Sequence, residues 1–278
     1  MTRNPLGEGE YAPLFTTVVE PGGSAPEARS GSGEDTAAVF LHGLMGRGKN
    51  FAATAQALQR RSILVDAPNH GRSPWTTAFS YQQMVDLTAA TLRELTAEPV
   101  HLVGHSMGGK TAMLLALEHP ELVKTLTVVD IAPTQRGSQS VFRRLIGALA
   151  ALPVDTISSR AQADELLREM VPENTVRAFL LQNLVRGDHG FEFEPNIELL
   201  LASLDDIVGF PEVSGKSYEG PTLWVAGGDS NYVQDGDLPV MEQLFPDTVP
   251  VSVAGSGHWV HSEKPREFQQ LLSDFLAE

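Results

Sequence analysis

The sequence predicts an α/β fold in which helices flank a mostly parallel central sheet. Short apolar segments bounded by Gly, Pro or Asp alternate with longer helical segments. Such short apolar segments are typical of strands buried on both faces. Their alternation with helices favours parallel pairing through right-handed crossovers. One region, from about residue 134 to residue 215, shows helical patterns but no strand pattern.

Seven segments have the pattern of a strand. We expect strands at Leu14–Glu20, Ala37–Leu41, Ser62–Asp66, Val100–Gly104, Thr125–Asp130, Pro221–Ala226 and Val249–Ala254. Residues 21–36 are rich in Gly, Ser and Pro, which indicates a flexible surface loop. Residues 1–36 therefore form an N-terminal strand and loop, and residues 37–133 and 216–278 form the sheet domain.

The helices divide into two groups. Those of the sheet domain are expected at Asn50–Arg60, Tyr81–Thr96, Met107–His119 and from Pro265 to about Leu276. A second group lies in residues 134–215, at Ser140–Leu152, Ser159–Val171, Glu173–Val185 and Asn196–Val208. This insertion is too long for a simple connection. We interpret it as a helical cap over the carboxyl ends of the strands.

Composition excludes several classes of protein. The chain has 278 residues and no cysteine, which rules out disulfides, cysteine zinc sites and a cysteine nucleophile. A net charge of −15 disfavours nucleic acid and anionic membrane surfaces as partners. Neither a signal peptide nor a membrane-spanning apolar run is visible. We expect a cytoplasmic protein without membrane insertion, and the sequence leaves its oligomeric state open.

The segment Gly104–Gly108 fits the pattern G-x-S-x-G between an apolar strand and a helix. In this context the pattern indicates a nucleophile elbow, in which a tight turn requires Gly104 and Gly108 and exposes the hydroxyl of Ser106. The variable position, His105, is expected to pack inside. A serine hydroxyl is a weak nucleophile, so Ser106 needs a neighbouring base.

The base is expected to be His258, which follows the last strand on a Gly-rich loop. His261 lies three residues further on and is expected to face the surface or cap a turn. Two carboxylates could orient the base, because both end strands near the nucleophile: Asp130, and the alternative acid Asp229. Either would stabilise the charged form of the histidine.

Two backbone N–H groups are expected to form an oxyanion hole. Met107 directly follows the nucleophile, and Leu44 lies in the loop after the Ala37–Leu41 strand. We expect His42 to shape that loop by hydrogen bonding, and Asn69–Gly71 to form a structural turn nearby. His258 and His261 lack a third ligand in sequence, so we expect no metal and no cofactor.

These motifs together resemble the α/β-hydrolase superfamily, and in particular its serine esterases of the bacterial YbfF type and the ABHD11 kind. The matching stretches are His42–Gly46, Asp66–Ser73, Gly104–Lys110, Val129–Pro133 and Gly257–Pro265. In members resembling this chain the acid is often the Asp of the D-I-A-P stretch, which favours Asp130. This sequence also keeps an acid at Asp229, where those members often carry Asn. The resemblance further implies acyl chains of short to medium length.

The sequence thus predicts a serine hydrolase that cleaves carboxylic esters, and as a second substrate class thioesters, through an acyl-enzyme. Three alternatives use the same fold. An acyltransferase would replace water by an alcohol, a cofactor-free lyase would use the triad to abstract a proton, and a non-catalytic receptor would use the pocket to bind a ligand.

Overall fold

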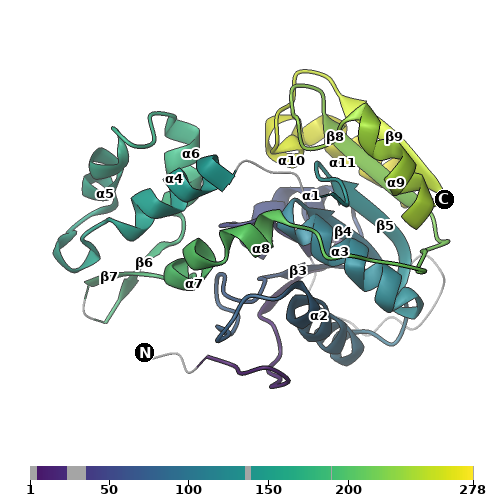
Figure 1. The fold of residues 1–278 in the computed structure, drawn as a ribbon, viewed down its shortest axis with the longest axis horizontal. Coiled ribbons are helices and arrows are strands. Elements are labelled where there is room, and N and C mark those ends of the chain that lie inside the picture. Colours follow the sequence, from purple (N-terminus) through teal and green to yellow (C-terminus); the bar gives the residue numbers. More distant parts are fainter. Residues whose placement is uncertain (1–4, 24–35, 135–138, 189, 278) are drawn as a thin grey trace.

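A seven-stranded sheet forms the centre of the molecule (Figure 1). The computed structural model describes residues 5–23, 36–134, 139–188 and 190–277. The strand order is β1-β3-β2-β4-β5-β8-β9, with β1 antiparallel and the others parallel. The strands are β1 (Thr16–Val19), β2 (Ala38–Leu41), β3 (Ser62–Val65), β4 (Val100–His105), β5 (Val123–Val129), β8 (Thr222–Gly227) and β9 (Thr248–Val253). The predicted mostly parallel sheet is confirmed.

Both faces of the sheet are buried, as its apolar strands require. In β2, Val39 and Leu41 join one hydrophobic cluster, while Ala38 and Phe40 join the cluster on the opposite face, because side chains alternate along a strand. Helices α2 (Tyr81–Leu95), α3 (Met107–Glu118) and α9 (Leu238–Leu244) cover the first face. Helices α1 (Ala52–Ala57), α10 (Val260–Glu263) and α11 (Pro265–Phe275) cover the second.

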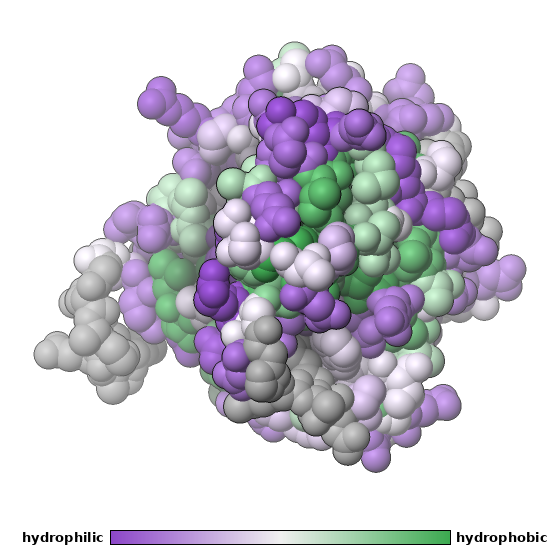
Figure 2. All heavy atoms as spheres, turned by 90° about the vertical axis from the view of Figure 1, so that its left-hand side faces the viewer, coloured by the Kyte–Doolittle hydropathy of each residue, from purple (hydrophilic) through white to green (hydrophobic). Residues whose placement is uncertain are grey.

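The segment between β5 and β8 forms a separate layer beside the sheet domain (Figure 1). We call its described residues, from the start of α4 to the end of α8, the cap. Its helices are α4 (Gln139–Ala150), α5 (Arg160–Leu167), α6 (Asn174–Leu181), α7 (Ile197–Ala202) and α8 (Leu204–Val208). Figure 2 views the molecule from this side: hydrophobic side chains gather in the middle of the face and hydrophilic ones surround them.

The cap is not purely helical, and here the sequence interpretation was wrong. Strands β6 (Leu184–Gly187) and β7 (Gly190–Phe193) form an antiparallel hairpin, although we expected one helix from Glu173 to Val185. The reason is the turn chemistry: Gly190 has a φ of 140°, which favours glycine. The glycines at both ends of the turn stop the helical pattern and allow the chain to reverse.

Other differences are small. The helix expected at Asn50–Arg60 is a 3₁₀ turn (Gly48–Phe51) followed by α1, and α9 and α10 were not predicted. The predicted loop at residues 21–36 falls mostly on residues 24–35, which lie outside the described part of the chain. No helix within the described ranges is long and apolar enough to cross a membrane.

Candidate active site

The turn between β4 and α3 holds Ser106 in a strained backbone conformation. Its φ is 53° and its ψ is −118°, a combination that costs about 1–3 kcal/mol and persists mainly at functional sites. The turn is tight enough to require glycine on both sides. A Cβ at Gly104 would lie 2.4 Å from the Gly108 carbonyl oxygen, and a Cβ at Gly108 would lie 2.3 Å from the Leu41 carbonyl oxygen.

Two backbone amides flank this serine without internal partners. Met107 begins α3, so its N–H is one of the groups that a helix start leaves unpaired. Leu44 lies in the loop after β2, and within the described residues neither amide donates to another backbone carbonyl. The Leu44 loop is shaped by His42, whose Nδ1 donates to the Gly43 carbonyl oxygen at 2.8 Å. Both amides are therefore free to donate to a ligand.

The structure brings His258 and Asp130 together. His258 Nδ1 donates to Asp130 Oδ2 at 2.7 Å, and the carboxylate is fully buried. The Asp130 oxygens also accept hydrogen bonds from the Gly227 amide at 2.9 Å and from Ser230 Oγ at 2.5 Å. Because three donors converge on it, this carboxylate is held in one orientation.

The other candidate acid lies elsewhere. Asp229 is exposed, and its N–H donates a hydrogen bond to the Ser256 carbonyl oxygen at 2.9 Å. Within the described chain its carboxylate forms no hydrogen bond or ion pair with His258. The geometry therefore separates the two acids that the sequence left open.

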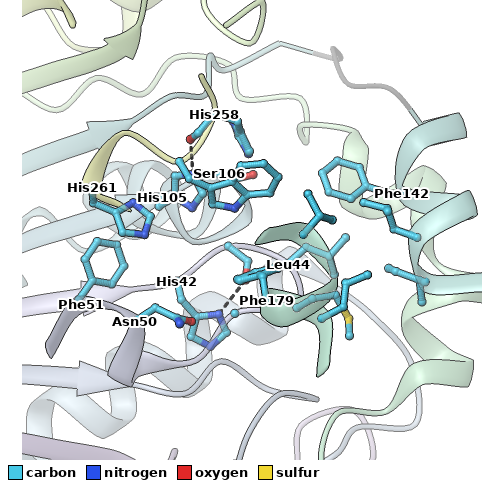
Figure 3. Close-up of a pocket in the computed structure, with 18 residues that line it drawn as sticks. His42, Leu44, Asn50, Phe51, His105, Ser106, Phe142, Phe179, His258 and His261 are labelled. Atoms are coloured by element: carbon cyan, nitrogen blue, oxygen red, sulfur yellow. Dashed lines mark hydrogen bonds between the residues drawn. The ribbon is translucent and has the colours of Figure 1, made fainter. Parts of the chain in front are cut away.

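Ser106 and His258 line the same pocket (Figure 3). Among the described residues their side chains form no hydrogen bond to one another; such bonds are often long in structures without substrate and tighten when it binds. Since Nδ1 carries the proton given to Asp130, Nε2 is the nitrogen left to accept one. The arrangement can therefore move a proton from Ser106 to His258.

Several groups hold the His258 ring and its loop. The Tyr232 ring stacks on the imidazole with centroids 4.0 Å apart. His105 Nε2 donates to the His258 carbonyl oxygen at 2.8 Å. Glu263 accepts hydrogen bonds from the amides of Gly257 and Trp259 at 2.7 and 3.3 Å. These contacts fix the orientation that a base needs before substrate arrives.

The prediction for His261 was wrong. It does not face the surface: its ring is buried, stacks on Phe51 at 4.5 Å and meets the edge of His105 at 4.8 Å. Burial lowers the pKa of His261 to about 3, so the ring is neutral at physiological pH. Its neighbours come from distant parts of the chain, which is why its sequence position alone suggested exposure.

The walls of the pocket are apolar where the cap meets the sheet domain. Cap residues on α4 and α6 supply this surface: Phe142, Leu145, Ile146, Val176, Phe179 and Leu180. The inner cavity beside Ser106 measures about 30 Å³ and an adjoining outer pocket about 350 Å³. Phe179 and Trp259 line both, with ring centroids 5.9 Å apart. The two rings therefore border both the inner cavity and the outer pocket.

Some residues of the site escaped the sequence interpretation. Ser230 and Tyr232 follow the exposed Asp229, and their position at the carboxyl end of β8 was the available signal. Lys110 is buried and donates from Nζ to the carbonyl oxygens of residues 207, 208 and 209 at 3.1, 2.5 and 2.7 Å. It thereby ties the C-terminus of α8 to α3, and no simple pattern signals such a contact. Burial lowers the Lys110 pKa to about 7.

Within the described residues, no group of three or more His, Asp or Glu side chains could hold a metal ion. The site offers the chemistry of a serine, a histidine and a carboxylate beside the backbone amides of Leu44 and Met107. Fold and site together define a hydrolase in which a serine on a strand-to-helix turn faces an apolar pocket.

Comparison with known proteins agrees with a hydrolase. Residues 37–265 match the family model described as alpha/beta hydrolase fold, and the chain belongs to this family. It is 42% identical over 249 residues to the mouse "sn-1-specific diacylglycerol lipase ABHD11", covering 87% of this chain and 81% of that protein. It is 31% identical to "Esterase YbfF" of Escherichia coli K12, covering 86% and 92%.

A solved structure supports the same conclusion. The "Marine microorganism esterase" matches with a TM-score of 0.87 and 30% identity, covering 95% of this chain and 99% of that one. The predicted resemblance to YbfF-type and ABHD11-like esterases is confirmed, and the chain is a carboxylic ester hydrolase.

Proposed function

We propose that Ser106, His258 and Asp130 form the catalytic triad of this esterase. The observation that carries the proposal is the His258–Asp130 hydrogen bond of 2.7 Å at the pocket that Ser106 also lines. A carboxylate in this position keeps the imidazole in the tautomer that accepts the serine proton, and it stabilises the imidazolium that results.

In the proposed mechanism the Ser106 oxygen attacks the ester carbonyl carbon while His258 Nε2 takes the hydroxyl proton. The Leu44 and Met107 amides donate hydrogen bonds to the carbonyl oxygen as it becomes negative. In such sites this stabilisation of the oxyanion is usually the largest single contribution to catalysis. His258 then gives its proton to the leaving alcohol. Water, activated in the same way, attacks the acyl-enzyme and releases the acid.

The pocket supports a proposal for the substrate class. Its walls beside Ser106 are apolar, and the inner cavity of about 30 Å³ is narrow. We therefore propose esters with acyl chains of short to medium length, with thioesters as a second class. A neutral acyl chain suits these walls, because burying an unpaired charge among them would be unfavourable. A cytoplasmic location stays a prediction from the sequence.

The test is hydrolysis of a panel of esters and thioesters of increasing acyl length by the wild-type protein and by Ser106→Ala. We expect the variant to lose about 10⁴- to 10⁶-fold in kcat. Ser217→Ala, which changes an exposed serine, is the matched control and should keep full activity. Substantial hydrolysis by Ser106→Ala would contradict the nucleophile. An ester product formed with added alcohol would instead support the acyltransferase alternative.

A further inference from the structure

The peptide units around Met45, directly after the proposed oxyanion donor Leu44, are held from two sides. The Met45 N–H donates to His70 Nε2 at 3.1 Å, and the Met45 carbonyl oxygen accepts from Asn183 Nδ2 at 2.8 Å. Met45 has a φ of 62°, a conformation that a non-glycine residue adopts only when its surroundings impose it. His70 belongs to the sheet domain, whereas Asn183 belongs to the cap.

The contact from the sheet domain has a defined polarity. His70 Nδ1 donates to the Pro68 carbonyl oxygen at 2.9 Å, which leaves Nε2 as an acceptor for the Met45 amide. Burial lowers the pKa of His70 to about 3, so the ring stays neutral and keeps this polarity at physiological pH. The ring is fully buried, so water cannot replace the Met45 amide as its hydrogen-bond partner.

The contact from the cap is equally defined. Asn183 Nδ2 faces two carbonyl oxygens, those of Met45 at 2.8 Å and Leu180 at 3.2 Å, so the amide has only one workable orientation. The side chain is fully buried, yet its Oδ1 has no hydrogen-bond partner within the described chain. A buried unpaired oxygen lowers stability, and such departures from the usual pairing rules gather at functional sites.

Asn183 also lies next to the helix that lines the pocket. It follows α6 by two residues, and Val176, Phe179 and Leu180 of that helix face the inner cavity. The same cap segment therefore contacts both the pocket and the loop that carries Leu44.

We propose that Asn183 and His70 are positioning residues that clamp the Met45 peptide units and thereby aim the Leu44 amide at the developing oxyanion. The proposal rests on the proposed function, because it assigns a role to groups behind the oxyanion hole. The proposal makes the cap part of the catalytic apparatus. Removing the hydrogen bond from Asn183 to the Met45 carbonyl oxygen should weaken binding of the transition state more than binding of the ester.

The principal test is Asn183→Leu, which removes the donor at 2.8 Å and keeps a side chain of similar size. It leaves the longer hydrogen bond from Gln182 Nε2 to the Met45 carbonyl oxygen, at 3.4 Å, in place. We expect kcat to fall about 10- to 100-fold while KM changes less than about threefold, because a displaced donor affects mainly the transition state. Binding of a trifluoromethyl ketone analogue of the same ester should weaken by the same factor as kcat/KM. Rates are expressed per active site, titrated by covalent labelling with a fluorophosphonate, so that misfolded protein is not counted.

Tyr81→Phe is the matched control. The Tyr81 hydroxyl donates to the Ile207 carbonyl oxygen at 2.7 Å, so this variant also removes one buried hydrogen bond between sheet domain and cap, away from the Leu44 loop. Its kcat should stay within twofold of wild type. On the other side of the clamp, His70→Gln, which keeps an acceptor, should retain more kcat than His70→Leu.

An unchanged kcat per active site in Asn183→Leu, or an equal loss in Tyr81→Phe, would overturn the clamp. Failure of the wild-type protein to hydrolyse esters or to be labelled at Ser106 would instead overturn the proposed function. The two failures are distinguishable because the first is measured relative to an active wild-type enzyme.

Discussion

The sheet domain and the cap contribute different chemistry to one pocket. At the carboxyl edge of the sheet, strained turns present polar groups: Ser106 after β4, and Asp130, with a φ of 49°, after β5. The cap faces them with apolar side chains such as Phe142 and Phe179. The difference indicates a division of roles, in which changes at the sheet edge alter kcat and changes in the cap alter which acyl chain binds. Asn183 is the proposed exception.

The sharpest test of this division compares the two acids. Asp130→Asn should lower kcat by about 10⁴-fold, because the amide no longer fixes the correct histidine tautomer or stabilises its charge. Asp229→Asn should change kcat less than twofold, since its carboxylate is exposed and has no bond to His258 within the described chain. Steady-state kinetics on one ester decide between them, and a larger loss at position 229 would contradict the assignment of Asp130.

The second prediction concerns acid stability, which we expect the sheet domain to limit. Five buried histidines have pKa values lowered by burial: those of His42, His70, His101, His105 and His261. Because the pKa in the unfolded chain is near 6.5, the unfolded state binds protons first as pH falls below that value. Stability is therefore full above about pH 6.5 and is lost toward the folded pKa values, about 4 for His42 and about 3 for His70.

Urea unfolding at pH 7 and pH 5.5 measures this effect. As the pH falls from 7 to 5.5, each histidine that stays neutral in the folded state should lower the free energy of unfolding by about 1.2 kcal/mol. The upper bound for all five is about 6 kcal/mol. The control is His101→Gln: this ring lies outside the pocket, and its removal should reduce the pH-dependent loss by one such increment. Equal stability at both pH values would show that these rings are not held neutral.

The fold was predictable because its strands are buried on both faces and bounded by Gly, Pro or Asp. The same signal is weaker in the cap, where the start of β6, Leu184 and Val185, was taken for the end of a helix and the hairpin was not predicted. Its strands have four residues each, too short for their alternation to outweigh the apolar run before them.

In the site, the sequence predicted Ser106 as the nucleophile and His258 as the base. The residues themselves left the acid open, and only the family resemblance favoured Asp130. Asp130 and Asp229 both follow neighbouring strands, and only the side-chain direction distinguishes them. That direction depends on the backbone of Asp130 and on donors from a strand far along the chain, Gly227 and Ser230. Such convergence depends on three-dimensional packing, which no local pattern records.

A third prediction tests the role of the cap in selecting the acyl chain. Phe179→Ala should remove the side chain that meets Trp259 between the inner cavity and the outer pocket. Longer acyl chains then gain room, and the ratio of kcat/KM for an octanoyl to a butanoyl ester should rise about tenfold, as expected for added apolar contact. Leu166→Ala, at an exposed cap position, is the control and should leave the ratio unchanged. A uniform loss of kcat in Phe179→Ala would contradict the division between cap and sheet edge.

The smallest expected effect lies within the sheet edge itself, at Ser230. Its hydroxyl is one of three donors to Asp130, and Ser230→Ala leaves those from Gly227 and His258 in place. The carboxylate loses one of the hydrogen bonds that orient it and keeps the other two, so kcat should fall only about threefold. Ser230→Thr restores a hydroxyl and should recover the rate. A loss near that of Asp130→Asn would mean that Ser230, rather than the Gly227 amide, determines where the carboxylate points.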